Sequence, residues 1–286
     1  MPKAAVAQLC STDDLQANLA TCRRLAGQAA ERGATLLVLP ECFAFLGRRE
    51  ADKFAVAERL LDQQPGPILR TIKEIATSHR MWVIAGGIAE IRDEDADLAQ
   101  PATAYNSCAV VNPDGELVSV YRKIHLFDVD IPGGATLMES AATSPGREVL
   151  AVDTSIGKVG LSICYDLRFP ELYRQLSLDM GAEVLVVPAA FTAHTGAAHW
   201  HTLLRARAIE NQCWVLAAGQ TGRHNDKRQS YGHSLIIDPW GVIRDEIEEG
   251  DGIAIAEIDA SFTREKRTQL PCLTHSVLRK ADGRSA

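Results

Sequence analysis

Short apolar runs alternate with longer amphipathic segments along most of the chain. Residues 3–9 and 35–39 have the apolar character of strands, and the second run is typical of a strand buried on both faces. Between them, residues 13–32 carry apolar side chains at helical spacing and are followed by Gly33, a common helix stop. Strand, helix and strand in this order predict an α/β fold.

The same criteria extend this prediction to the rest of the chain. Residues 92–100 are polar and acidic and are expected to form an exposed hairpin tip, and residues 276–286 are expected to be a tail beyond a domain at 1–275. The other predicted strands are 82–91, 104–111, 116–122, 146–154, 158–163, 183–187, 214–218, 234–238, 242–247 and 253–258. The other predicted helices are 51–61, 68–79, one from about 171, 199–212 and 261–268.

Two turn motifs in this pattern resemble each other. Residues 110–118 read VVNPDGELV and residues 236–243 read IIDPWGVI. Asn or Asp, then Pro, then Gly two positions later is the composition of a type I turn, which can join antiparallel strands. Either the turn chemistry coincides by chance, or the chain has two halves wound alike. Because no Pro- or Ser-rich linker separates them, we expect one domain with two sheets and covering helices.

Composition and charge narrow the class of protein. Of the 286 residues, 46% are hydrophobic and 23% are charged, which excludes collagen-like, coiled-coil and wholly disordered chains. Thirty Lys and Arg against 37 Asp and Glu give a net charge of −7 without a basic block, so no nucleic-acid partner is expected. No apolar run approaches the ~20 residues of a membrane helix. We therefore expect a soluble cytoplasmic protein with no membrane partner.

The seven cysteines are scattered and include no CxxC pair. This spacing argues against a disulfide framework and against a structural zinc site, so no metal is expected. Most of these thiols should be small buried side chains in a reducing compartment.

Three chemically distinctive residues follow predicted strands. Cys164 lies where an apolar strand gives way to a helix, Glu41 directly follows 35–39, and Lys123 directly follows 116–122. Each residue alone has an ordinary interpretation as a buried thiol, an exposed loop acid or a solvated amine. Together they place a thiol, a carboxylate and an ammonium at strand ends, where open α/β sheets carry their sites.

At these positions the chain resembles the nitrilase superfamily, the carbon–nitrogen hydrolases. The matching motifs are LPE at 39–41, YRKIHLFD at 121–128 and GLSICYDLRFPEL at 160–172. The resemblance covers about residues 3–273 and implies a four-layer α-β-β-α sandwich. It also implies that the sandwich pairs into a homodimer, an extended α-β-β-α/α-β-β-α assembly, or forms a higher homo-oligomer, and that no cofactor is needed.

The resemblance also implies roles for individual residues. Cys164 would be the nucleophile, Glu41 the general base, and Lys123 an oxyanion stabiliser, helped by the backbone N–H of Tyr165. Glu139 matches a second carboxylate of the family, although an exposed loop acid is the ordinary alternative. A thiol pKa of about 8.5 against about 4.3 for Glu makes Glu41 a weak base. We expect burial to raise the pKa of Glu41. The Lys123 ammonium should stabilise the thiolate and also oppose that rise, so the three groups should titrate as a coupled set.

The substrate is the least determined feature. Residues 189–212 and 222–234 resemble an amidase branch that acts on small carboxylate-bearing amides through a thioester, with release of ammonia. Another aliphatic amide, a nitrile, or a non-catalytic binding role on the same fold stays open, as does a Cys–His mechanism using one of four histidines. The candidate substrate-binding residues are Arg168, Phe191, Thr195 and Arg223, with Lys227 and Arg228 as further loop cations. The four histidines are His125, His199, His201 and His233, which we expect to be structural.

Overall fold

The computed structural model describes residues 1–92, 102–130 and 136–277. Residues 93–100 of the expected hairpin tip and residues 278–286 of the expected tail lie outside these ranges. None of the helices in the described ranges has the length and apolar character needed to cross a bilayer.

One sheet has the strand order β17-β1-β2-β3-β4-β5, with β8 pairing beside β4. Its strands β1, β2 and β3 are parallel, and β17 and β4 run antiparallel to their neighbours β1 and β3. The bounds are β1 Lys3–Gln8, β2 Ala34–Leu39, β3 Trp82–Glu90, β4 Ala104–Val111, β5 Leu117–Arg122, β8 Thr143–Ser144 and β17 Gly252–Glu257.

The other sheet has the order β16-β15-β12-β11-β10-β9. Its strands β10, β11 and β12 are parallel, and β9 and β15 run antiparallel to β10 and β12. When the second order is reversed, from β9 to β16, it matches the first sheet strand for strand, with β1-β2-β3 corresponding to β10-β11-β12. The chain therefore does contain two halves wound alike. The bounds are β9 Ala151–Thr154, β10 Gly157–Gly160, β11 Val184–Val186, β12 Trp214–Ala217, β15 Ser234–Ile237 and β16 Ile243–Ile247.

The two similar turn motifs occupy equivalent places in the two sheets, between β4 and β5 and between β15 and β16. Asn112 Oδ1 accepts from the backbone N–H groups two and four residues further on, at 3.1 and 2.9 Å. Asp238 Oδ1 does the same at 2.8 and 3.0 Å. Gly115 and Gly241 have positive φ angles of 81° and 85°, which glycine adopts without steric cost. The shared motif therefore reflects shared topology.

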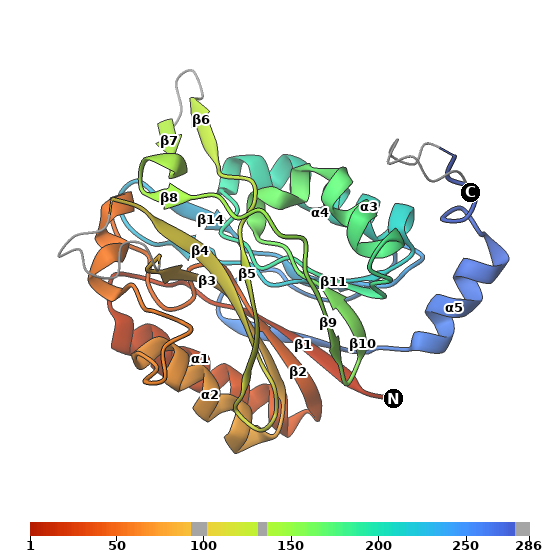
Figure 1. The fold of residues 1–286 in the computed structure, drawn as a ribbon, viewed down its shortest axis with the longest axis horizontal. Helices are drawn as coiled ribbons and strands as arrows, with labels where there is room; N and C mark the ends of the chain where they lie inside the picture. Colours follow the sequence, from red (N-terminus) through yellow and green to blue (C-terminus); the bar gives the residue numbers. More distant parts are fainter. Residues whose placement is uncertain (93–101, 131–135, 278–286) are drawn as a thin grey trace.

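The helices lie outside the two sheets (Figure 1). Helices α1 Leu15–Glu31 and α2 Pro67–His79 cover the first sheet, and α3 Pro170–Leu178 and α4 Ala193–Asn211 cover the second. Alternate residues of β2 confirm the layering, since Leu36 faces the second sheet and Leu37 faces the α1–α2 layer. The predicted α-β-β-α sandwich is confirmed. The remaining elements are β6 Asp128–Asp130, β7 Thr136–Met138, β13 Thr221–Arg223, β14 Gln229–Tyr231 and α5 Ala260–Gln269.

Two predicted helices differ from the structure. The helix expected at 51–61 is only a 3₁₀ helix, Glu50–Val56, because the backbone at Glu58 bonds instead to β3 at Ala89 and to Ile91. Helix α4 begins at Ala193, six residues earlier than expected. The early turn contains Gly196, a weak helix former, where a Cβ would come within 2.3 Å of Tyr231.

Candidate active site

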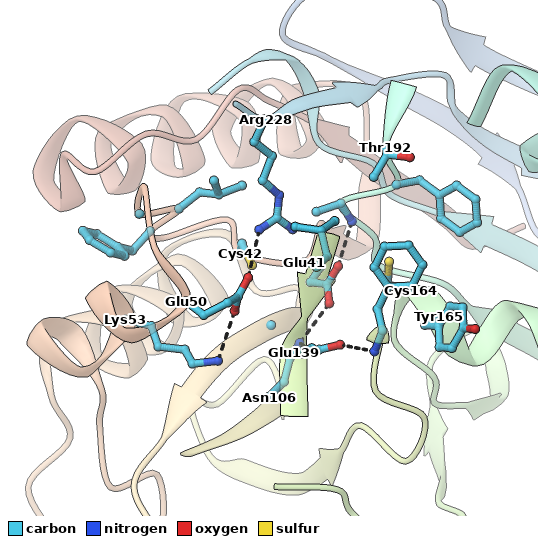
Figure 2. Close-up of a pocket in the computed structure, with 18 of the residues that line it drawn as sticks. Glu41, Cys42, Glu50, Lys53, Asn106, Glu139, Cys164, Tyr165, Thr192 and Arg228 are labelled. Atoms are coloured by element: carbon cyan, nitrogen blue, oxygen red, sulfur yellow. Dashed lines mark hydrogen bonds and ion pairs between the residues drawn. The ribbon is translucent and has the colours of Figure 1, made fainter. Parts of the chain in front are cut away.

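A pocket of about 790 Å³ opens where the two sheets bring the ends of their parallel strands together (Figure 2). Its lining includes Glu41, Lys123, Glu139, Cys164 and Tyr165. The residues expected at separate strand ends are therefore brought to one cavity.

Glu41 lies in the loop after β2 and is 3% exposed. Its Oε1 accepts from Asn106 Nδ2 at 2.8 Å and from Lys123 Nζ at 3.0 Å, and its Oε2 accepts from the backbone N–H of Ala190 at 2.9 Å. The loop can approach β3 because Gly87 has no side chain, since a Cβ there would lie 2.3 Å from the backbone nitrogen after Glu41. A buried carboxylate is tolerated here because both oxygens have donors.

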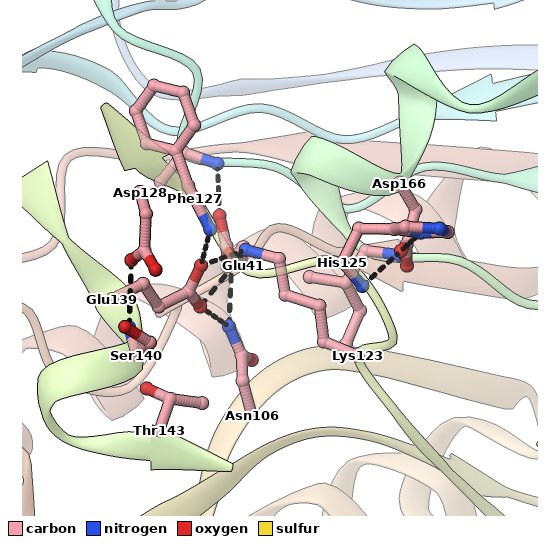
Figure 3. A network of polar contacts seen from close by, with 12 residues as sticks. Glu41, Asn106, Lys123, His125, Phe127, Asp128, Glu139, Ser140, Thr143 and Asp166 are labelled. Atoms are coloured by element: carbon pink, nitrogen blue, oxygen red, sulfur yellow. Dashed lines mark hydrogen bonds and ion pairs between the residues drawn. The ribbon is translucent and has the colours of Figure 1, made fainter. Parts of the chain in front are cut away.

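Lys123 and Glu139 form the second part of this network (Figure 3). Lys123 Nζ, on a side chain 2% exposed, donates to Glu139 at 2.8 and 3.1 Å as well as to Glu41. Glu139 begins a 3₁₀ helix, Glu139–Ala141 (η3), and also accepts from the backbone N–H of Phe127 at 2.7 Å. Glu139 is therefore a partner of the ammonium and not an exposed loop acid.

Asn106 on β4 is a site residue that sequence reasoning missed. Its Nδ2 donates to Glu41 at 2.8 Å and to Glu139 at 3.2 Å, so one amide joins the two carboxylates. Its Oδ1 is buried and has no hydrogen-bond partner among the described residues. The only signal in the sequence was a polar residue inside an apolar strand.

Cys164 starts the 3₁₀ helix Cys164–Arg168 (η4), and its φ of 49° is unusual for a residue other than glycine. Its own N–H donates to the carbonyl oxygen of Pro188 at 2.9 Å. That N–H is therefore already used, and the N–H of Tyr165 stays the expected backbone donor for an oxyanion. Tyr165 itself lines the pocket. Cys42, the residue after Glu41, lines the pocket as well.

Asp166, which is fully buried, connects the Cys164 turn to the Lys123 loop. It accepts from the backbone N–H of Ile163 at 2.9 Å and from the backbone N–H of His125 at 3.0 Å. Tyr121 Oη donates to the same carboxylate at 2.6 Å. Sequence reasoning read this acid only as the start of a helix, although it fixes the turn that carries the thiol.

The pKa values of Glu41, Lys123 and Cys164 set the charges of the resting site. Burial acts to raise the pKa of Glu41, but Lys123 and the neighbouring Cys164 thiol outweigh it and hold the pKa at about 2. Burial and the Glu41 carboxylate raise the pKa of Cys164 well above its ordinary value. Burial opposes the ammonium form of Lys123, yet Glu139 and Glu41 raise its pKa. Burial and Lys123 oppose each other as expected, but the net shift of the Glu41 pKa is downward and not upward, because ion pairing exceeds desolvation. The resting site holds a carboxylate, an ammonium and a neutral thiol.

Three of the four candidate substrate-binding residues lie at the pocket. Arg168 has its guanidinium 5.3 Å from the ring centre of Phe191, and both line the pocket together with Thr195. Thr195 does not cap α4, because Thr192 is the N-cap and accepts from the N–H of Thr195. Arg223 is not among the described residues that line the pocket, and its side chain is 70% exposed beside Asp226.

Arg228 occupies the place expected for Arg223. It lines the pocket, lies 3.7 Å from Glu50, and its buried Nε has no partner among the described residues. The hairpin of β13 and β14 explains why Arg228 and not Arg223 lines the pocket. Arg223 is the last residue of β13 and its side chain is exposed, whereas Arg228 follows the turn just before β14 and points back toward Glu41 (Figure 2).

None of the four candidate histidines contacts Cys164 in the described structure. His125 stacks on Phe169 and bonds to Asp166, and His199 lies 3.3 Å from Arg168. His201 and His233 both contact Glu246. None of the four is among the described residues lining the pocket, in contrast to Glu41.

Comparisons with known proteins agree with this fold and site. Residues 3–268 match the carbon–nitrogen hydrolase family model. The chain is 44% identical to the deaminated glutathione amidases of Homo sapiens and of a Synechocystis strain, over 96% of its length and 82% and 97% of theirs. The crystal structure of the Caenorhabditis elegans NitFhit protein superposes with a TM-score of 0.87 at 41% identity, covering 96% of this chain and 65% of that one.

The chain belongs to the carbon–nitrogen hydrolase family, within the nitrilase superfamily. It is an enzyme that hydrolyses carbon–nitrogen bonds of small amides.

Proposed function

We propose that the enzyme is a cysteine amidase for small carboxylate-bearing amides, with deaminated glutathione as its substrate. The observation that carries the proposal is the buried Glu41–Lys123–Glu139 network opposite Cys164, in a pocket that also presents Arg168 and Arg228. The identity to deaminated glutathione amidases supports the choice of substrate.

Cys164 is proposed as the nucleophile and Glu41 as its base. Because the thiol is neutral at rest, proton transfer to Glu41 accompanies attack on the carbonyl carbon and does not precede it. The sulfur–carbon bond forms while the carbonyl π bond opens to an oxyanion, which Lys123 and the Tyr165 N–H stabilise. Glu139 acts through Lys123 as a positioning residue.

The leaving amine takes the proton from Glu41 as the carbon–nitrogen bond breaks, and a thioester remains. Water then attacks the thioester, gives a proton to Glu41, and the acid leaves as Cys164 regains that proton. For deaminated glutathione the leaving amine is that of cysteinylglycine and not ammonia, and the acid is α-ketoglutarate. A primary amide would release ammonia by the same steps.

The carboxylates of such a substrate need cations that the net charge of −7 conceals. Arg168 and Arg228 fit this role because both line the pocket near Cys164 and Glu41, and a guanidinium pairs with a carboxylate through two hydrogen bonds. The unpartnered Nε of Arg228 is available to a ligand. Phe191 and Thr195 complete this wall of the pocket.

A substrate panel tests the proposal. Deaminated glutathione, α-ketoglutaramate and an aliphatic nitrile would be compared, with α-ketoglutarate measured for the first two and ammonia for the third. The proposal expects the highest kcat/KM for deaminated glutathione. Faster turnover of α-ketoglutaramate would identify an omega-amidase, which the sequence also resembles, and no turnover by folded protein would favour a binding role.

A cytoplasmic homodimer is also part of the proposal. All seven cysteines are free thiols, as expected in a reducing compartment, and members of the superfamily that the sequence resembles pair through their sandwiches. Sedimentation equilibrium should give twice the chain mass. The proposed domain boundary at residue 275 predicts that removing 276–286 leaves the melting temperature unchanged.

A further inference from the structure

A second cluster of ligating side chains lies away from the pocket. His201 on α4, His233 before β15 and Glu246 on β16 bring their ligating atoms within 4.8 Å of one another. His201 Nε2 and His233 Nδ1 each lie 2.7 Å from the same oxygen, Glu246 Oε1. These three residues are separate from the described pocket lining, and the proposed hydrolysis does not use them.

The structure holds this cluster in a fixed arrangement. His233 has a left-handed φ of 56°, and its carbonyl oxygen accepts from Trp200 Nε1 at 2.8 Å. Tyr231 stacks on the His233 ring at 4.3 Å and meets the His201 ring edge-on at 6.1 Å. A left-handed backbone at a residue other than glycine persists only where surrounding contacts enforce it. The imidazoles are therefore positioned before any ligand arrives.

The cluster is also open to water. The side chains of His201, His233 and Glu246 are 32%, 24% and 23% exposed. An ion can therefore reach them, and water can complete its coordination. Two imidazoles and one carboxylate form a ligand set suited to Zn²⁺ and neighbouring divalent transition ions, whereas Mg²⁺ and Ca²⁺ prefer oxygen ligands.

We propose that His201, His233 and Glu246 bind a divalent transition-metal ion with Zn²⁺-like preferences. Binding replaces the two histidine hydrogen bonds with two nitrogen–metal bonds. Each neutral ring moves its proton from the nitrogen that donated to Glu246 to the nitrogen that faces away from the ion, so no net proton is released. The ion would connect α4, the start of β15 and β16. Because the cluster is separate from the pocket residues, we assign the ion a structural role that is independent of the proposed hydrolysis.

The spacing of the histidines explains why the sequence alone does not reveal this site. His199 and His201 are two positions apart on a helix, so their side chains point in different directions. His199 faces Arg168 and His201 faces Glu246, so the helix supplies one ligand and the second sheet supplies the other two. Only the fold brings them together.

The experiment is calorimetric titration of Zn²⁺ into the full chain carrying Cys164→Ala, which removes the active-site thiol as a competing ligand. We expect one site that is weakened at least about tenfold by Glu246→Gln, which keeps the shape and removes the charge, and by His201→Asn. His199→Asn is the matched control from the same helix and should bind as the parent does. Zn²⁺ should raise the melting temperature of the parent and the control only.

Circular dichroism confirms that each variant is folded before titration. Equal Zn²⁺ affinity in the parent and the Glu246→Gln variant would overturn the proposal, since the ion would then lie elsewhere. Absence of binding to the folded parent would also overturn it and leave a hydrogen-bonded His–Glu–His group. Neither result depends on amidase activity, so both are independent of the proposed function.

Discussion

The loops after β2 and β11 occupy equivalent places in the two halves of the molecule but carry different chemistry. Residues 36–41 read LLVLPE and residues 184–189 read VLVVPA, and each run forms the middle strand of a parallel trio. The first loop ends in Glu41, a buried acceptor. The second supplies a donor, the N–H of Ala190, which bonds to Glu41. The fold thus places two similar strand ends together, and the side chains make one anionic and the other neutral.

The largest expected effect comes from removing the Glu41 carboxylate, the charge that distinguishes the loop after β2 from the loop after β11. Glu41→Gln should lower kcat/KM about 10³- to 10⁴-fold, because the thiol loses its base. Since the Glu41 carboxylate raises the pKa of Cys164, the same variant should lower that pKa. Turnover and the pH dependence of Cys164 alkylation measure the two effects. Near-normal turnover in Glu41→Gln, with a histidine variant inactive, would show that the Cys–His mechanism operates instead.

Asn106, on β4 in the first half, tests how far the carboxylate network depends on one shared hydrogen-bond donor. Asn106→Leu preserves volume but removes the donor shared by Glu41 and Glu139, so the network should loosen. We expect kcat to fall about 10- to 100-fold with little change in KM. Steady-state kinetics provide the measurement, and Asn106→Ser, which keeps a hydroxyl donor, should recover part of the loss. If KM rises while kcat holds, Asn106 contacts substrate directly.

Arg228 and Arg223 form a matched pair on one hairpin in the second half. Arg228→Gln should raise KM about 10-fold or more, because a charge-assisted hydrogen bond contributes about 1.5–3 kcal/mol. Arg223→Gln should leave KM unchanged, since that side chain is 70% exposed beyond the pocket lining. Kinetics with a carboxylate-bearing amide and its neutral analogue test this. Equal effects of the two substitutions would remove Arg228 from the binding site.

The smallest expected effect concerns a contact between the halves. His224 is buried between Ser11 and Ser230, and burial lowers its pKa from 6.5 to about 4. The unfolded chain then binds the proton more readily, so stability is full above pH 6.5 and declines as the pH falls toward 4. Between pH 7 and pH 5.5 the loss should be about 1 kcal/mol. Urea unfolding of wild type and of His224→Gln at both pH values measures this loss. The prediction is contradicted if the free energy of unfolding changes between the two pH values by the same amount in both proteins.

The sequence predicted the strands best, because apolar runs such as 35–39 and 104–111 match buried strands closely. It also identified Glu41, Lys123 and Cys164, whose residue types are unusual at strand ends. Their roles rested on resemblance to a family and stay proposals.

What the sequence could not show depends on the packing of distant segments. Asn106 and Asp166 are ordinary polar residues until the fold brings carboxylates or loop N–H groups to them. The lowered pKa of Glu41 required the distance to Lys123, which no spacing reveals. The choice between Arg223 and Arg228 depended on the path of a hairpin.

The hydrogen bond from Ala190 to Glu41 spans 149 positions of the chain. A newly made or partly unfolded chain therefore has a thiol and a carboxylate but no assembled catalyst. In the proposed mechanism, hydrolysis becomes possible only when the two sheets dock. Recovery of activity during refolding should therefore report that docking step and follow the recovery of helical signal.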